Sequence, residues 1–309
     1  MDQIVAQSRA AIVKGSRSFR TASRLFDRTL REDVWQLYAW CRHCDDEIDG
    51  QDHGHGGTAL SGIERQARLD RLRRLTARAL AGEPVDEPAF AAFQRVALRH
   101  KLAAEWPLAL LDGFALDVEA HDFEGLEDVL GYCWGVAGVV GVMMATIMGS
   151  RDQQVLRRAQ DLGIAFQLTN ICRDVAEDAR NGRVYLPAAW LRQAGIAPTP
   201  EGVLGAIGDE ALFGVVRELL ALADQYYASA RVGLRHLPFR AALAVAAAQG
   251  IYREIGLVLL DRGAGGLARR TVVSRPRKLL HIGRSLLLAV ASRGQRRRMP
   301  ARPALWSRI

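Results

Sequence analysis

Helical periodicity runs along nearly the whole of the 309-residue chain and constrains its fold more than any other feature. Apolar residues recur at the spacing of amphipathic helices, whereas no Val-, Ile- and Thr-rich strand pair joined by a tight turn is visible. The pattern therefore predicts a single all-α domain without an internal repeat or an interdomain linker. The predicted helices cover residues 3–14, 30–49, 60–81, 88–103, 106–120, 125–149, 152–180, 201–208, 210–235, 239–262 and 276–292.

Composition places the chain among globular proteins with a sizeable core, because 49% of its residues are hydrophobic and 25% are charged. It contains four cysteines, too few for a disulfide scaffold, and this count favours a reducing compartment. The N-terminal segment lacks the long apolar stretch of a secretory signal. We therefore expect a cytoplasmic protein, or one held peripherally at the inner face of the membrane.

Basic charge is concentrated at the C-terminal end. From Arg262 onward there are 13 Lys and Arg residues and no Asp or Glu, which leaves a mildly acidic body. We expect a helical domain at 1–292 and a basic tail at 293–309 that contains Trp306. Because a basic, apolar terminal segment suits an anionic bilayer, the tail is a candidate for peripheral membrane contact. The alternative is a helix at 276–292 that packs on the body, with solvated arginines; no zinc-finger spacing or RNA-binding aromatic motif indicates a nucleic-acid partner.

The most apolar stretch, residues 132–149, carries no charge over 18 residues and is just long enough to span a bilayer. Four glycines interrupt its apolar run, and acidic residues crowd its N-terminal flank. These features favour a buried helix of small residues beside a cavity over a membrane span.

Acidic residues cluster at the end of the predicted helix 30–49. At about 100° per residue, and counting from Val34 in the apolar stripe, Asp45 falls at about 20°, Asp49 at about 60° and Arg42 at about 80°. A carboxylate pair aimed at the interior needs a counter-charge, which a divalent cation supplies. The alternative for such a run is a solvated acidic face at the end of a helix.

A second polar edge lies on the predicted helix that contains Ile164. Counted from that residue, Asp178 falls at about 40°, Gln167 at about 60° and Asp174 at about 80°. Together with Asn170, they give this inward edge only oxygen ligands, which suits Mg²⁺ rather than zinc. By the same geometry, three charged residues point away from this edge, and the first two can pair with each other: Arg173, Glu177 and Arg180.

The two acidic edges lie far apart in the sequence of one helical domain. If they face each other across a cavity, they can hold Mg²⁺ ions that bind a diphosphate. The helices that carry the acids are otherwise apolar, so the rest of the cavity should be apolar as well. The residues thus predict a site for an isoprenoid diphosphate that depends on Mg²⁺, with Mn²⁺ as the alternative metal.

Four segments carry a resemblance to a known family: GSRSF (15–19), LYAWCRHCDDEID (37–49), YCWGVAGVVG (132–141) and NICRDVAEDARNGRVYLP (170–187). They resemble the squalene/phytoene synthase family, most closely its bacterial phytoene synthases, over roughly residues 8–280. The segment through GRVYLP is highly specific. Glu47 departs from the family pattern, which often has an apolar residue there; at about 220° it points away from the stripe, so we expect no functional effect.

The resemblance implies an isoprenoid synthase fold of helices around a central apolar cavity. It implies a prenyltransferase that condenses two geranylgeranyl diphosphates head to head, via prephytoene diphosphate, to phytoene, with release of diphosphate and without NADPH, as in carotenoid biosynthesis. A squalene-type or presqualene diphosphate synthase acting on farnesyl diphosphate is the alternative within the family. A catalytically silent subunit that only binds prenyl chains or membranes is a third hypothesis, against which the intact aspartates argue.

The resemblance also implies roles for single residues. The implied metal ligands are Asp45, Asp46, Asp49, Asn170, Asp174 and Asp178, and the catalytic residues are Arg42, Asp45, Asp174 and Tyr132, the last of which handles a proton. The implied substrate-binding residues are Ser16, Ser18 and Phe19 in a flap, Arg42 and Arg173 near the diphosphates, Tyr38, Gln167, Asn170, Tyr185 and Tyr252 in the cavity, and Arg270. Arg269 is the alternative to Arg270, and ordinary core packing is the alternative for Tyr38 and Tyr252.

Overall fold

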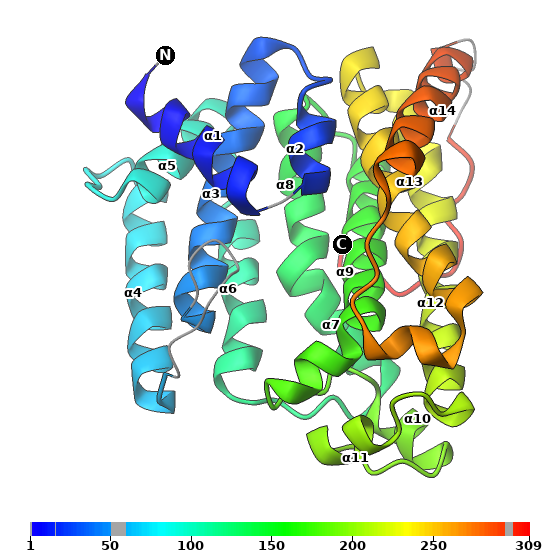
Figure 1. The fold of residues 1–309 in the computed structure, drawn as a ribbon. Helices are drawn as coiled ribbons and strands as arrows, with labels where there is room; N and C mark the ends of the chain where they lie inside the picture. The colour runs from blue at the N-terminus through cyan, green and yellow to red at the C-terminus, as the bar shows by residue number, and fades with distance from the viewer. Residues whose placement is uncertain (1, 16, 51–59, 294–298) are drawn as a thin grey trace.

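The computed structural model describes residues 2–15, 17–50, 60–293 and 299–309, which form a bundle of helices (Figure 1). These residues contain no strand, and this confirms the predicted all-α class. The α-helices are α1 (Gln3–Gly15), α2 (Arg17–Ser23), α3 (Arg28–Asp49), α4 (Gly62–Leu80), α5 (Pro88–His100), α6 (Glu105–Val118), α7 (Leu126–Cys133), α8 (Val139–Ile147), α9 (Gln153–Arg180), α10 (Ala188–Gln193), α11 (Pro200–Gly205), α12 (Glu210–Gly233), α13 (Phe239–Arg262) and α14 (Arg275–Arg293).

Capping residues set several of the helix starts. Asp27 caps α3 by accepting a hydrogen bond from the backbone N–H of Leu30. Ser61 and Glu64 form a capping box at the start of α4, and Pro88 occupies the first turn of α5. The short helices α2 and α10 lie outside the predicted ranges, because six or seven residues contain too little periodicity to indicate a helix.

The predicted helix 125–149 is divided into α7 and α8 by a π-helical turn, η1 (Trp134–Gly138). Glycines let this turn approach α6 closely, since a Cβ added at Gly135 would lie 2.8 Å from the Cα of Gly113. Turns of this kind are frequent at functional sites. Residues of η1 and α8 line the cavity described below, as the small residues of this stretch predict.

Among the residues that the structure describes, two helical segments are long and apolar enough to cross a membrane by length and composition alone, Leu126–Ile147 and Phe239–Arg262. In the apolar windows of these segments, 67% and 56% of the residues are buried inside the fold. Core helices pass the same test, so length and apolarity do not by themselves assign a membrane span. The burial of the first segment agrees with the buried helix that its glycines predict.

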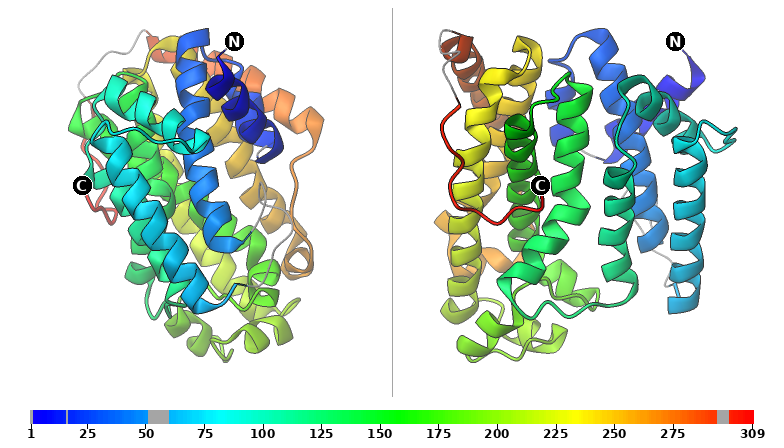
Figure 2. Two further views of the ribbon diagram at one scale, coloured as in Figure 1. Left: turned by 90° about the vertical axis from the view of Figure 1, so that its left-hand side faces the viewer. Right: turned by 180° about the vertical axis from the view of Figure 1, so that it is seen from behind.

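Helix α9 lies in the middle of the fold and packs against α8, α12 and α13 (Figure 2). One cluster of buried apolar side chains gathers around α9 and α12, and a second gathers among α3, α5, α6 and α8. The acidic end of α3 and the acidic half of α9 therefore belong to different parts of the core. This arrangement leaves a cavity between them.

The last residues of the chain return to the body of the protein, where Figure 2 shows the C-terminus beside the central helices. Arg302 forms an ion pair with the fully buried carboxylate of Asp161 on α9, with 2.6 Å between Nη2 and Oδ1. Trp306 packs against both core clusters, and the hydroxyl of Tyr226 donates a hydrogen bond to its carbonyl oxygen (3.2 Å). Residues 299–309 of the predicted basic tail are thus anchored to the body.

Candidate active site

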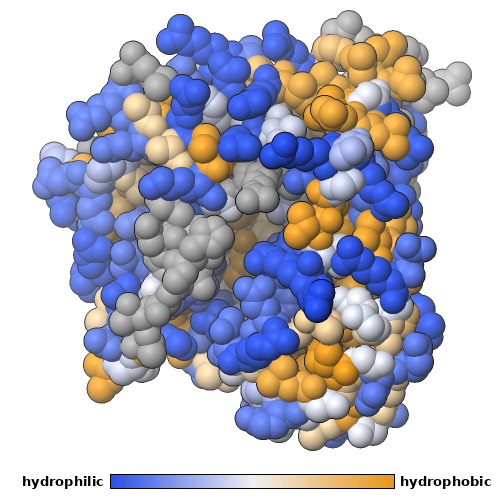
Figure 3. All heavy atoms as spheres, viewed as in Figure 1, coloured by the Kyte–Doolittle hydropathy of each residue, from blue (hydrophilic) through white to orange (hydrophobic). Residues whose placement is uncertain are grey.

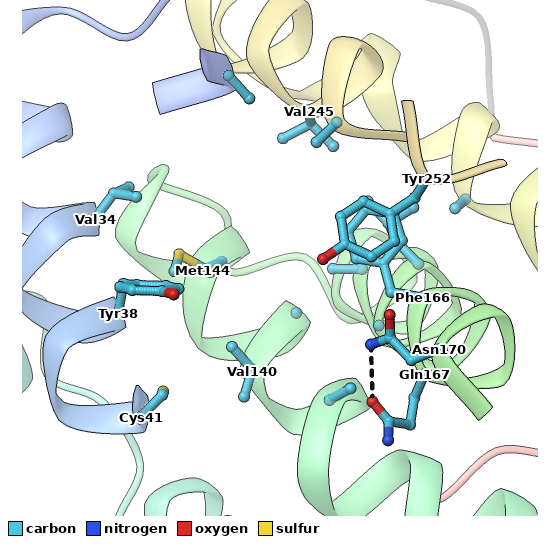
Figure 4. Close-up of a pocket in the computed structure, with 18 of the residues that line it drawn as sticks. Val34, Tyr38, Cys41, Val140, Met144, Phe166, Gln167, Asn170, Val245 and Tyr252 are labelled. Atoms are coloured by element: carbon cyan, nitrogen blue, oxygen red, sulfur yellow. Dashed lines mark hydrogen bonds between the residues drawn. The ribbon is translucent and has the colours of Figure 1, made fainter. Parts of the chain in front are cut away.

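A cavity of about 580 Å³ lies among α3, α6, α8, α9 and α13, and a hollow near the centre of the face in Figure 3 leads toward it. Part of its wall is polar, and the rest is lined by apolar and small side chains (Figure 4). The polar lining residues include Tyr38, Arg42, Asp45, Gln167, Asn170, Arg173, Tyr252 and Arg270. The apolar ones include Phe26, Val34, Phe114, Val140, Met144 and Met148.

The acids at the end of α3 share one arginine. The Nη1 atom of Arg42 lies 2.9 Å from Asp45 Oδ2, and its Nη2 atom lies 2.8 Å from Asp46 Oδ1. Burial raises the pKa of Asp45 to about 7; Arg42 opposes this shift, whereas the neighbouring carboxylates of Asp49 and Asp46 add to it. The structure places Asp45 at the cavity wall, as the helical wheel predicts, in surroundings that favour a bound positive charge.

The acids of α9 are only partly neutralised by the protein. Asp174 accepts a hydrogen bond from Arg173 Nε (2.8 Å) and forms an ion pair with Arg270, with 3.2 Å between Nε and Oδ1. Burial raises the pKa of Asp178 to about 8, and the charge on Asp174 adds to the shift. Asp178, which lies beside this edge of the cavity, is therefore a carboxylate for which the protein supplies too little positive charge.

Asn170 leaves an oxygen atom free at the same edge. Its Nδ2 group donates a hydrogen bond to Gln167 Oε1 (3.3 Å), but its Oδ1 atom is buried and has no hydrogen-bond partner. A buried acceptor without a donor is costly unless a ligand or an ion completes it. The predicted ligands Asn170 and Asp178 are thus both left without a full set of protein partners.

The prediction that Arg173 points away from the acidic edge is wrong. Its side chain is 13% exposed, lines the cavity and pairs with Asp174 rather than with Glu177. Glu177 and Arg180 are exposed, as predicted, and Glu177 pairs with Arg270 at 3.4 Å. The helical wheel fails here because α9 is packed on several sides, so that the side opposite the apolar stripe is also interior.

Arg183 joins the two acid-bearing helices, although the sequence analysis assigns it no role. It follows α9, and its Nη2 atom lies 2.8 Å from Asp49 Oδ1 on α3. Burial lowers its pKa, but Tyr185, Asp49 and Asp117 raise it above the usual value on balance. In the part of the chain that the structure describes, the acids do not converge into one group of three or more His, Cys, Asp or Glu side chains able to hold a metal.

Asp117 on α6 is a partly buried carboxylate that the sequence analysis also missed. Tyr185 donates a hydrogen bond of 2.6 Å to its Oδ1 atom and Tyr132 one of 3.1 Å to its Oδ2 atom, and the two tyrosine rings stack with centroids 4.9 Å apart. Burial raises the pKa of Asp117, opposed by Arg183 and by the hydrogen bonds. Tyr132 lines the cavity, so this trio joins the carboxylate to the cavity wall. An acid near the end of a largely apolar helix is the signal that could have indicated it.

Tyr38 and Tyr252 face the cavity from opposite walls (Figure 4). Tyr252 packs on Phe166 with ring centroids 4.3 Å apart. The end of α1 approaches Tyr38 so closely that a Cβ at Gly15 would lie 2.6 Å from the hydroxyl oxygen. Burial raises the pKa of both tyrosines, so both hydroxyls stay neutral. Both residues border the cavity, as the resemblance implies.

The remaining predicted residues belong to the flap segment and to the segment before α14. Ser16 lies outside the described residues, and Ser18 and Phe19 belong to α2, which borders the cavity through Ser23. Of the two candidate arginines in the late segment, Arg270 lines the cavity and Arg269 does not; Arg269 is exposed.

Comparison with known sequences identifies the class of protein. The sequence model of the squalene/phytoene synthase family matches residues 12–278, so the chain belongs to this family of prenyltransferases. The chain is 50% identical over 283 residues to the 15-cis-phytoene synthase of a Paracoccus species, covering 92% of this chain and 91% of that protein. It is 46% identical over 301 residues to the phytoene synthase of Pseudescherichia vulneris, covering 96% and 95%.

Comparison with solved structures gives the same fold. A dehydrosqualene synthase determined in complex with a ligand superposes with a TM-score of 0.83 at 26% identity, over 94% of this chain and 97% of that chain. The squalene synthase HpnC from Alicyclobacillus acidocaldarius superposes with a TM-score of 0.73 at 25% identity, over 84% and 94%. The predicted family and the predicted isoprenoid synthase fold are therefore both confirmed.

Proposed function

We propose that the protein is a phytoene synthase, which joins two geranylgeranyl diphosphates head to head, via prephytoene diphosphate, to phytoene in carotenoid biosynthesis. One observation carries the proposal: a single cavity combines a wall of arginines and carboxylates with an extensive apolar lining. The former suits a diphosphate and the latter a long hydrocarbon chain. Identity of 46–50% to two phytoene synthases over more than nine tenths of the chain supports the C20 substrate over the C15 alternative.

The polar wall fits a divalent cation. The buried Asn170 Oδ1 atom has no donor, and Asp45 and Asp178 are carboxylic acids whose pKa is raised by burial, so a cation supplies the charge that the protein does not. When bound, the ion neutralises charge that develops on the departing diphosphate. The residues that we propose as ligands of Mg²⁺, or of Mn²⁺, are Asp45, Asp46 and Asp49 on α3 and Asn170, Asp174 and Asp178 on α9.

The arginines of the polar wall bind the phosphate oxygens in this proposal. Arg42, Arg173 and Arg270 present forked guanidinium donors that match phosphate geometry. Each of the three pairs with a proposed metal ligand, so a diphosphate bound between the arginines lies next to the ions. The other proposed substrate contacts are Ser16, Ser18 and Phe19 of the flap and Tyr38, Gln167, Asn170, Tyr185 and Tyr252.

The rest of the cavity protects a cation and removes a proton. Apolar walls keep water from the allylic cation that ionisation leaves, and the ring faces of Tyr38 and Tyr252 stabilise positive charge. Tyr132 donates its hydroxyl hydrogen to Asp117, so its oxygen lone pairs remain to accept the final proton. As the oxygen accepts that proton, the original hydroxyl proton passes to Asp117, whose raised pKa suits the role.

One incubation tests the proposal. Purified protein with Mg²⁺ is given C20 or C15 diphosphate, with and without NADPH, and the hydrocarbon is identified by mass spectrometry. We expect phytoene from the C20 substrate whether or not NADPH is present. A reduced C30 hydrocarbon that forms from the C15 substrate on addition of NADPH would show a squalene-type enzyme instead. The Asp174→Asn variant is the control, because it should form no product from either substrate.

The membrane contact expected of the basic tail remains a prediction, as does the cytoplasmic location. Arg302 and Trp306 are engaged with the body of the protein, which leaves Arg308 as the exposed arginine of residues 299–309. Co-sedimentation of anionic vesicles with the full chain and with a version that ends at Ser292 tests the tail. Equal binding of both versions would contradict a role for it.

A further inference from the structure

Helix α14 turns its apolar side toward solvent. Its buried side, which packs on α13, carries the polar or small residues His281, Ser285 and Ala289 at intervals of four. At about 100° per residue, the exposed apolar side chains share an arc of about 120° on the opposite side. These side chains are 48–72% exposed: Leu279, Leu280, Leu286, Leu287 and Val290.

This apolar surface is concentrated rather than scattered. Of the twelve large hydrophobic side chains that are exposed in the described part of the chain, six lie between Val272 and Val290. Figure 3 shows apolar residues gathered over α14, at the upper right. Arg275, Arg277 and Arg284 are exposed on the same helix. A contiguous apolar patch bordered by charge marks an interaction site.

The patch is continuous with the cavity. Val272, which is 61% exposed, and Lys278, in the first turn of α14, both line the cavity wall. Leu279 and Leu280 follow Lys278 directly. Whatever covers the exposed face of α14 therefore lies against the mouth of the cavity.

A cluster of arginines lies on the other side of the same mouth. Arg9, Arg20, Arg24, Arg28 and Arg31 line a second pocket around Trp35, and Arg31 lies 5.4 Å from the indole centroid. Glu32 is the one carboxylate among the described residues that line this pocket, and it pairs with Arg28.

The two surfaces belong to the same end of the molecule. The arginine pocket shares Ile12 and Ser23 with the wall of the main cavity. Helices α1, α2 and α14 all lie in the upper half of the views in Figures 1 and 2. Apolar side chains and a pocket with five arginines and one carboxylate thus flank one opening.

We propose that this end of the molecule docks on a bilayer that contains anionic lipid. The apolar face of α14 enters the boundary between headgroups and acyl chains, the arginine pocket binds headgroup phosphates, and the cavity opens onto the lipid. The purpose of the docking, the exchange of prenyl chains with the bilayer, rests on the proposed function. A second copy of the chain fits less well, because a two-fold contact through α14 brings its arginines against their own copies.

Co-sedimentation with vesicles of phosphatidylcholine, with or without phosphatidylglycerol, tests the docking. The full chain should bind the anionic vesicles, and the variant with Leu279→Asp and Leu287→Asp should bind them at least about tenfold more weakly, because two inserted leucines are lost. The matched control is Ile63→Asp, since Ile63 is 85% exposed at the start of α4, at the opposite end of the molecule. It should bind like the wild type. Unchanged far-ultraviolet circular dichroism excludes misfolding of either variant.

Two results would overturn the docking. One is wild-type binding that is absent or that the α14 substitutions leave unchanged. The other is a dimer in sedimentation equilibrium that the same substitutions dissociate, which would assign the face to a second copy. Vesicle binding needs no turnover, so Asp174→Asn should bind normally. Phytoene formation without docking contradicts only the docking, and docking without phytoene formation contradicts only the proposed function.

Discussion

Replacing Arg302 by methionine should destabilise the protein strongly, although Arg302 lies only seven residues before Ile309 in the sequence. Its guanidinium makes contacts of 2.6, 3.0 and 3.2 Å with the fully buried carboxylate of Asp161. It also donates hydrogen bonds to the carbonyl oxygens of Leu305 (2.8 Å) and Trp306 (2.9 Å). Methionine retains part of the apolar stem and none of these bonds, so the change isolates the charge and the hydrogen bonds.

The size of the effect depends on the partners that Asp161 keeps in the Arg302→Met variant. Ser229 still donates to it, and Arg158 still donates to Ser229 (2.6 Å), but the direct ionic partner is lost. Removing one partner of a buried ion pair costs about 3–5 kcal/mol. For a chain of this length, 1 kcal/mol corresponds to roughly 2 °C in Tm. We therefore expect Tm to fall by about 6–10 °C.

Thermal unfolding followed by circular dichroism measures this loss. Arg308→Met is the matched control, because Arg308 is exposed and only its backbone N–H bonds to Gln160 (3.2 Å), so its cost should stay within about 0.5 kcal/mol. Adding Asp161→Asn to Arg302→Met should recover part of the loss, since it removes the unpaired buried charge. Equal Tm values for the two methionine variants would refute the anchoring role of Arg302.

Three other predictions concern the cavity. Asp45→Asn or Asp174→Asn should abolish product formation, and near-normal rates at low Mg²⁺ would contradict the metal assignment. For Asp45→Asn, Tm in EDTA should hold or rise slightly because a repelling carboxylate is removed, whereas Asp174→Asn should lower Tm because Arg173 and Arg270 lose their charged partner. Between pH 5 and 8, the metal-free protein should lose Tm as pH rises, because folding raises the pKa of Asp45 to about 7 and of Asp178 to about 8, so the folded state holds protons that the unfolded state has released. A Tm that rises over this range in EDTA would exclude the shifts. Asp117→Asn should lower kcat by roughly 10²-fold or more with little change in KM, and a loss confined to KM would assign Asp117 to substrate binding instead.

The acidic edge of α3 could be predicted because the acid-bearing end of this helix buries one side. The buried residues there, Cys44 and Ile48, lie within about 40° of each other, so the angle of Asp45 next to them places it at the cavity. On α9 the same method failed for Arg173, since that helix is packed on several sides and has no single polar face there. A helical wheel is thus informative for a helical segment that buries one side and weak for a segment that is packed on several sides.

The residues that the sequence analysis missed act over long separations in the chain. Arg183 binds Asp49 of another helix, and Asp117 accepts a hydrogen bond from Tyr185, 68 residues away. Arg302 binds Asp161, 141 residues away. Periodicity and charge runs describe one helix at a time, so they do not indicate which buried acid a distant arginine will pair with.

The ion pairs of the polar wall imply that metal and diphosphate bind cooperatively. Four arginines are engaged with the acids of α3 and α9: Arg42, Arg173, Arg183 and Arg270. A diphosphate alone must therefore compete with carboxylates for its arginines, and a metal ion alone must compete with arginines for its carboxylates.

When both ligands bind, the metal ion takes the carboxylates and so frees the arginines for the diphosphate, and the diphosphate takes the arginines and so frees the carboxylates for the metal ion. This coupling must be reciprocal. Titration calorimetry of inorganic diphosphate should therefore show at least about tenfold weaker binding in EDTA than in Mg²⁺, a coupling of about 1.4 kcal/mol. Asp174→Asn should reduce this difference in diphosphate affinity. An uncharged amide binds Arg173 and Arg270 more weakly than the carboxylate does, so both arginines are available to the diphosphate without the metal. Equal affinity for diphosphate in EDTA and in Mg²⁺ would show that these ion pairs do not compete with either ligand.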